Sequence, residues 1–304
     1  MATSVKRTLV HFKNSRSSKN SVPAKFSQCV VEYFGSRDGL TADVHVNLAN
    51  NILEITDSQQ GRQPVKIKHP PFCPVKELTQ HRDIKLSPQT ADRGINVGAA
   101  IILETGDGKV LLTRRAKHLR AFPGIWVPPG GHIEDNETFE AAAVREYEEE
   151  TGLHVDLKQC VGNKLNLLAL WESVYPPKLS HGPPKRHHVV VYLHGKLMTA
   201  VTAETLKKKL KMDPSEVEAC AWFDRAAVSS IVSASGESSS SQSAGDRQTF
   251  SAVELDDKKM PVDTQLPFDA LLKTTADQEV FGRISTGTKF ALEEWLKLDR
   301  PTNS

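Results

Sequence analysis

GHIEDNETFEAAAVREYEEETGL, residues 131–153 of this 304-residue chain, is the stretch that decides the fold. An α-helix turns about 100° per residue, so Glu146, Glu149 and Glu150 share an arc of about 100° on one face. Like charges three and four residues apart repel each other, so this spacing does not by itself stabilise a helix. A divalent cation removes the repulsion, and ligation by oxygen atoms alone favours Mg²⁺ or Mn²⁺ over zinc. The stretch predicts a metal-binding helix, and the alternative is an acidic surface helix in water.

The residues around these acids fit a ligand site. Arg145 lies one helical turn before Glu149, where it can orient that carboxylate and keep it ionised. Gly152 follows the last turn, where a left-handed residue often closes a helix. Before the helix, Gly130 and Gly131 form a flexible loop whose backbone can approach a phosphate group. We therefore expect both glycines to contact the substrate.

This stretch resembles the Nudix box, G-x5-E-x7-R-E-U-x-E-E-x-G-U, in which U is a bulky apolar residue. One position departs from the pattern, because Tyr147 is aromatic where an aliphatic residue is usual. The resemblance to the family extends over residues 91–235. It implies an α/β (α+β) fold, a Nudix-type sandwich with a mixed curved β-sheet between helices. The matching residues are Gly131, Glu137, Arg145, Glu146, Glu149, Glu150, Gly152 and Leu153.

The resemblance implies a hydrolase of nucleoside diphosphate linkages that depends on Mg²⁺ or Mn²⁺. We expect Glu146 and Glu150 to hold the metal directly. Glu149 either completes the metal shell or acts as the general base, oriented by Arg145. Some enzymes of this family place the base on a later loop. The candidates for such a base, which the sequence does not rank, are Glu172, Glu216 and Glu218.

Basic and aromatic residues near the box are candidates for substrate contacts. We expect Arg114 and Arg115 to contact phosphates and Trp126 to stack on a base; the alternatives are a solvated basic run and a core tryptophan. A second basic cluster spans residues 178–188. The resemblance implies a nucleotide-type substrate, and capped RNA is the expected one, with m7GDP and 5′-monophosphate RNA as products.

Two alternative functions stay open. Coenzyme A-cleaving Nudix enzymes carry a related segment, which Leu111, Thr113, Arg115 and Gly124 match, but Pro128 stands where phenylalanine is expected. The other alternative is a nucleotide-binding Nudix module without catalysis. Such modules generally lose one or more of the acids in the box, whereas this chain keeps all three in register.

The composition bounds the class of protein. Hydrophobic residues make up 38% and charged residues 25% of the chain, and the net charge is +2. No apolar run approaches the roughly 18 residues that span a bilayer, so we expect no membrane partner. The small net charge does not indicate DNA sequence recognition. The cysteines at 29, 73, 160 and 220 show neither CxxC nor zinc-finger spacing, which favours reduced thiols in an intracellular, cytoplasmic protein.

The chain divides into three predicted regions. Residues 1–90 form an N-terminal extension whose basic tip, residues 1–31, has no acid; a mitochondrial transit peptide is the less favoured interpretation because no amphipathic helix is evident. Residues 91–235 form the Nudix domain. Residues 236–304 follow as a low-complexity linker and a C-terminal helix at 285–297.

Alternating apolar residues predict the strands and helices inside these regions. The predicted strands are residues 28–34, 43–48, 51–56, 97–104, 109–115, 154–158, 165–175, 187–197 and 216–224. The predicted helices besides the box helix and the C-terminal helix are residues 204–212 and 224–232.

Overall fold

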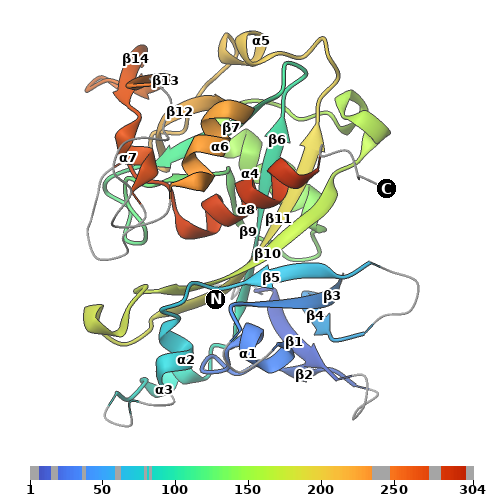
Figure 1. Cartoon of the computed structure of the whole chain (residues 1–304). Coiled ribbons are helices and arrows are strands. Elements are labelled where there is room, and N and C mark those ends of the chain that lie inside the picture. The colour runs from blue at the N-terminus through green and yellow to red at the C-terminus, as the bar shows by residue number, and fades with distance from the viewer. Residues whose placement is uncertain are drawn as a thin grey trace, which may run out of the picture. The chain divides into compact units, whose positions relative to one another are not determined.

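The computed structural model describes residues 7–14, 20–35, 39–58, 63–78, 81, 84–234, 247–273 and 282–298 (Figure 1). Its contacts divide the chain into two compact units, each described here by itself. Unit 1 comprises residues 1–99, 131–142 and 167–192, and unit 2 comprises residues 100–130, 143–166 and 193–304. Within the described residues, the helices are all too short or too polar to cross a bilayer.

Unit 1 is built on strands in the order β11-β10-β5-β3-β4-β1-β2. The sheet is mixed, because β1 pairs with β4 in parallel and β3 pairs with both β4 and β5 antiparallel. The strands are β1 (Leu9–Lys13), β2 (Val22–Pro23), β3 (Thr41–Ala49), β4 (Ile52–Thr56), β5 (Val65–Lys68), β10 (Asn166–Tyr175) and β11 (Arg186–Lys196). Its helices are α1 (Val30–Phe34), α2 (Pro74–Leu78) and α3 (Pro88–Ala91), and a 3-10 turn spans Leu179–His181.

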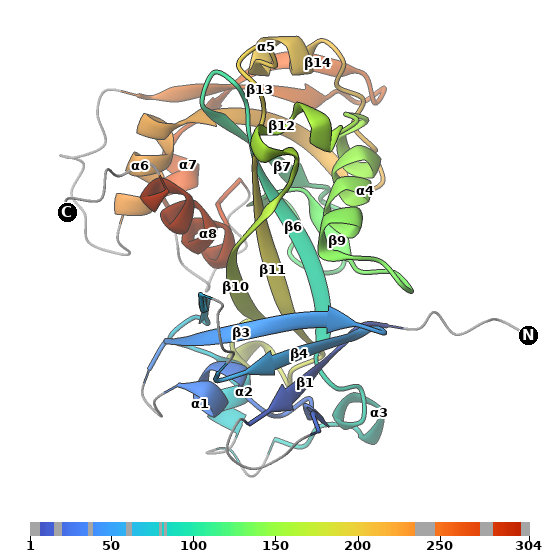
Figure 2. The same ribbon diagram turned by 90° about the vertical axis from the view of Figure 1, so that its right-hand side faces the viewer.

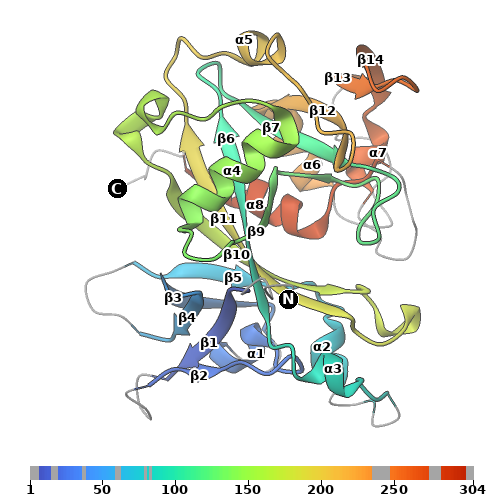
Figure 3. The ribbon, with the colours of Figure 1, turned by 180° about the vertical axis from the view of Figure 1, so that it is seen from behind.

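Unit 2 has strands in the order β14-β13-β12-β7-β6, with β8 paired to β7. The strands are β6 (Asn96–Glu104), β7 (Lys109–Arg115), β8 (Trp126–Val127), β12 (Val217–Asp224), β13 (Thr249–Leu255) and β14 (Pro261–Pro267). The first residues of β6, up to residue 99, belong to unit 1, as do residues 131–132 of β9 (Gly130–His132), which pairs with β6. The helices are α4 (Phe139–Thr151), whose residues 139–142 belong to unit 1, α5 (Ala203–Lys207), α6 (Arg225–Ser233), α7 (Asp269–Leu272) and α8 (Thr286–Lys297). Helix α4 lies on one face of this sheet, and α6 and α8 lie on the other (Figures 2 and 3).

This arrangement confirms the predicted mixed α/β fold with helices on both sides of a sheet. The predicted strands at 97–104 and 109–115 are confirmed as β6 and β7, which pair as a hairpin; in its turn Gly108 adopts a φ of 74° and its N–H donates to the Thr105 carbonyl at 2.9 Å. The C-terminal helix is also confirmed as α8, whose Trp295 is fully buried and donates its Nε1–H to Glu104 Oε2 at 2.9 Å.

Two strand predictions are wrong. Residues 30–34 form helix α1, in which the Cys29 side chain accepts the N–H of Glu32 as a helix cap. The Glu172 carboxylate also accepts the N–H groups of Val30 and Val31, which satisfies the first donors of the helix and offsets the β-preference of this short apolar run. Residues 154–158 form a loop and the start of a 3-10 turn at Leu157–Gln159, because the Asp156 carboxylate accepts the N–H of Lys158 and bends the chain.

The region after the Nudix domain also differs from expectation. Strands β13 and β14 form an antiparallel hairpin, and β13 adds to β12. Neither strand is among those predicted from the sequence. The predicted helix at 204–212 ends sooner, at Lys207 of α5. The low-complexity sequence expected to form a linker spans residues 233–245. From residue 235 onward it lies outside the described residues.

Candidate metal and catalytic site

Helix α4 has the boundaries that the box predicts. At its start, the Thr138 hydroxyl accepts the N–H of Ala141 at 3.1 Å, which satisfies a helix donor that has no partner within the helix. At its end, Gly152 adopts a φ of 67°, and its N–H donates to the Glu148 carbonyl at 2.7 Å. Tyr147 is 1% exposed, so the aromatic departure from the box serves the packing face of the helix.

Glu150 is the most constrained acid of the helix. Its side chain is buried, with Oε1 accepting the N–H of Gly130 at 3.2 Å and Oε2 accepting the Thr113 hydroxyl at 3.0 Å. Burial raises the pKa of the Glu150 carboxyl to about 8, and these two donors and the charge of Arg115 oppose the rise. A buried carboxylate with so few compensating donors favours a bound cation.

Glu150 belongs to a cluster of three carboxylates. Oxygen atoms of Glu146, Glu150 and Glu216 all lie within 4.8 Å of one another. The Glu146 side chain is 13% exposed, and burial raises its pKa, with Arg145 acting in the opposite direction. Three carboxylates at this spacing repel each other unless a cation or protons neutralise them. The residues therefore fit a divalent metal ion with oxygen ligands.

Backbone hydrogen bonds bring Glu216 to the helix. The N–H of Asp213 donates to the Glu150 carbonyl at 3.1 Å, and the N–H of Glu216 donates to the Asp213 carbonyl at 3.1 Å. On the other side, the Glu216 carbonyl accepts the N–H of Ala116 at 2.8 Å, just beyond β7. The loop before β12 is thus fixed at both ends, and it places the exposed Glu216 beside Glu146 and Glu150.

Arg145 contacts two of the acids of the box. Its Nη1 lies 3.0 Å from Glu149 Oε2 and 3.0 Å from Glu146 Oε1. The Glu149 side chain is 58% exposed. The orienting role expected of Arg145 stays a prediction, which these two contacts allow. The geometry also separates Glu149, at the open side of the helix, from the buried Glu150.

The remaining candidates for a general base have other partners. Glu218 accepts the Nε–H of Arg114 at 2.8 Å. Glu172 lies in unit 1, where it is fully buried and its Oε1 lies 2.9 Å from His187 Nε2. Of the three acids that the sequence could not rank, only Glu216 joins Glu146 and Glu150 in the cluster.

The side chains predicted to contact the substrate differ in their burial and in their partners. The Arg114 guanidinium is buried and pairs with Glu218 and Glu254. Trp126 is 1% exposed beside Arg114, which fits the core alternative rather than a stacking platform. Arg115 is half-buried and close enough to lower the pKa of Glu150.

The two loop glycines are placed differently. Gly130 acts through its N–H, which holds Glu150. The Gly131 carbonyl approaches the backbone of Gly98 so closely that a Cβ on Gly98 would lie 2.8 Å from it. Substrate contact by Gly130 and Gly131 stays a prediction.

The fold and the carboxylate cluster define a Nudix-type hydrolase. A family model described as the NUDIX domain matches residues 94–241. The chain is 40% identical over 299 residues to the m7GpppN-mRNA hydrolase NUDT17 of Danio rerio, covering 96% of each chain. It is 37% identical to the Xenopus laevis protein of that name over 99% of this chain and 98% of the relative. Identity to the Homo sapiens protein is 34%, over 92% and 86%. This chain belongs to the NUDIX hydrolase family.

Proposed function

We propose that this chain hydrolyses the phosphoanhydride linkage of capped mRNA and releases m7GDP and 5′-monophosphate RNA. The observation that carries the hydrolase is the clustering of the Glu146, Glu150 and Glu216 carboxylates within 4.8 Å of one another. The choice of capped RNA as substrate is supported by the relatives named m7GpppN-mRNA hydrolase, which match over nearly the whole chain.

Glu146, Glu150 and Glu216 would hold Mg²⁺ or Mn²⁺, because these ions prefer carboxylate oxygens. When bound, such an ion neutralises phosphate charge and lowers the pKa of a bound water. The Thr113 hydroxyl and the Gly130 N–H fix the two oxygens of Glu150, so that this ligand is oriented before metal arrives.

Arg145 orients the two acids on the more open side of the helix. Its Nη1 lies 3.0 Å from a carboxylate oxygen of Glu149 and 3.0 Å from one of Glu146. Glu149 is 58% exposed and can take a proton from an attacking water, which makes it the proposed general base. General base catalysis typically contributes about 10²–10⁴-fold to a rate.

Product analysis on a panel of substrates tests the assignment. The purified chain is incubated with m7G-capped RNA, coenzyme A, ADP-ribose and diadenosine polyphosphates, each with Mg²⁺ and with Mn²⁺. We expect m7GDP and 5′-monophosphate RNA, and the largest kcat/KM on capped RNA. Faster cleavage of coenzyme A would contradict the proposed substrate and favour the coenzyme A alternative.

The matched inactive protein is Glu150→Gln, which keeps the size of the side chain and removes its charge. Loss of all products in this variant assigns them to this site rather than to a contaminating nuclease. A wild-type protein that binds Mg²⁺ or Mn²⁺ in calorimetry but cleaves none of the four substrates would instead support a binding module.

A further inference from the structure

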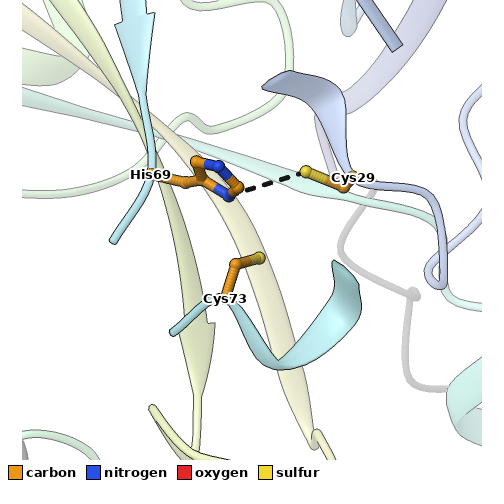
Figure 4. A group of neighbouring side chains, drawn as sticks. All are labelled: Cys29, His69 and Cys73. Atoms are coloured by element: carbon orange, nitrogen blue, oxygen red, sulfur yellow. Dashed lines mark hydrogen bonds between the residues drawn. The ribbon is translucent and has the colours of Figure 1, made fainter. Parts of the chain in front are cut away.

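A second group of metal-ligating side chains lies in unit 1, and it differs in kind from the carboxylate cluster. Cys29, His69 and Cys73 are all buried, and their ligand atoms lie within 4.8 Å of one another (Figure 4). They come from three places in the chain. Cys29 caps helix α1, His69 follows strand β5, and Cys73 precedes helix α2.

The spacing fits a tetrahedral metal. Cys29 Sγ lies 3.6 Å from His69 Nδ1. With Zn–S near 2.3 Å and Zn–N near 2.0–2.1 Å, a tetrahedral zinc ion separates its sulfur and nitrogen ligands by about 3.6 Å. All four cysteines of the chain lie in described ranges and are free thiols, so Cys29 and Cys73 do not form a disulfide.

The other nitrogen of His69 fixes which ring atom can bind a metal. His69 Nε2 lies 3.3 Å from the Gly39 carbonyl, which can only accept a hydrogen bond. The proton therefore sits on Nε2, and the lone pair of Nδ1 points toward Cys29 (Figure 4). Donation of the second ring N–H to a backbone carbonyl is the usual arrangement for a histidine that ligates a metal.

A fourth electron-pair donor faces the same point. Glu172 Oε2 lies 3.3 Å from Cys29 Sγ and 4.0 Å from His69 Nδ1. The single proton of the Cys29 thiol can serve only one of these two acceptors. A cation at this point would take the lone pair of His69 Nδ1 and balance the charge of the buried Glu172 carboxylate.

Glu172 is itself held rigidly. Its oxygens accept the N–H groups of Val30 at 2.7 Å and Val31 at 3.2 Å, and Oε1 lies 2.9 Å from His187 Nε2. His187 Nδ1 lies 2.7 Å from the Phe26 carbonyl, so that nitrogen carries a proton. The N–H groups of Val30 and Val31 stabilise the Glu172 carboxylate, and two thiolates would balance the charge of a divalent ion.

We propose that Cys29, His69 and Cys73 bind one zinc ion, with Glu172 beside them as the fourth ligand or as the acceptor that orients Cys29. Two sulfur atoms and an imidazole favour zinc over Mg²⁺ or Mn²⁺. The ion would join the start of α1 to the segment between β5 and α2. This site is independent of the proposed hydrolysis, because all of its residues belong to unit 1 and none is a box acid.

The test measures metal content and spectra of the full chain, expressed with zinc and purified under reducing conditions. We expect about one equivalent of zinc per chain by mass spectrometry. Cobalt replacing zinc should give a tetrahedral spectrum with thiolate-to-metal charge-transfer bands, which oxygen ligands do not produce. Cys29→Ala and Cys73→Ala should lower zinc affinity at least about tenfold. Cys160→Ala, which removes another buried thiol, should leave zinc content unchanged.

If the cysteine variants do not fold, a measurement on the wild-type protein still tests the proposal. In the folded protein, Cys29 and Cys73 should resist alkylation until a zinc chelator is added, as mapped by peptide mass spectrometry. Zinc-free protein that takes up neither zinc nor cobalt in the reduced state would overturn the proposal. A Cys29–Cys73 disulfide that persists in protein purified with zinc and with reductant would also overturn it.

Discussion

The two clusters of metal-ligating side chains in the described residues offer a cation different ligand atoms. The cluster in unit 2 presents three carboxylates, one of them exposed, whereas the cluster in unit 1 presents two thiols and an imidazole that are all buried. Carboxylate oxygens hold Mg²⁺ or Mn²⁺ loosely and leave room for water and phosphate, while sulfur and nitrogen close around zinc. The difference indicates that one ion exchanges during function and the other is part of the folded structure.

Brief treatment with EDTA should separate the two ions most sharply. We expect hydrolysis of capped RNA to fall to background, because the weakly held Mg²⁺ or Mn²⁺ leaves the carboxylate cluster first. Adding Mg²⁺ or Mn²⁺ alone should restore activity, with zinc content constant by mass spectrometry. Recovery that requires added zinc would mean that the sulfur-containing cluster supports catalysis, against the division proposed here.

Glu150→Gln should lower kcat by about 10²-fold or more, because it removes the buried metal-binding charge and keeps the fold. The measurement is steady-state hydrolysis of capped RNA together with the zinc content, which should not change. Glu148→Gln is the matched control on the same helix. Its side chain is 50% exposed and pairs with His154, so near wild-type activity is expected. Equal losses in both variants would refute the assignment of Glu150.

Glu216→Gln should have an intermediate effect, about tenfold on kcat with a higher metal concentration needed for half-maximal rate. The reason is that Glu216 is the exposed member of the cluster and joins it from a loop. Glu204→Gln, at an exposed acid of α5, serves as control. An unchanged metal requirement in Glu216→Gln would remove this residue from the site.

The smallest effect is on stability. Burial raises the Glu150 pKa from 4.5 to about 8 in the folded chain. The protonated form is thus favoured by folding, so the stabilisation is complete below pH 4.5 and is lost as the pH rises through about 8. The melting temperature of each protein is measured in chelator at about pH 6 and about pH 9. The drop between these two pH values should be at least about 2–4 °C larger for the wild type than for Glu150→Gln. Parallel pH profiles would contradict the raised pKa.

Local pattern was enough to predict the box helix, because its acids and its closing Gly152 lie within one stretch of sequence, whereas the cap at Thr138 was identified only in the structure. It was not enough for Glu216. That residue joins the site through backbone bonds from Asp213 to α4 and from Ala116 to the loop, and such long-range pairing leaves no periodic signal.

The second cluster was missed for a similar reason. Cys29 and Cys73 are far apart in sequence and show no zinc-finger spacing, so the chain pattern favoured plain reduced thiols. The interval from His69 to Cys73 was the one available signal. The missed hairpin at β13 and β14 had a clearer one, since buried Phe250 and Ala252 alternate with exposed neighbours as in a strand.

The loop that carries Glu216 is fastened by main-chain groups at Glu150, Asp213 and Ala116. Main-chain bonds survive most changes of side chain, so the exposed neighbour Pro214 can be substituted more freely than Ser215, whose hydroxyl donates to the Asp213 carboxylate at 2.8 Å. Evolution or protein engineering can therefore vary this loop to admit a different leaving group while the Glu216 carboxylate keeps its position.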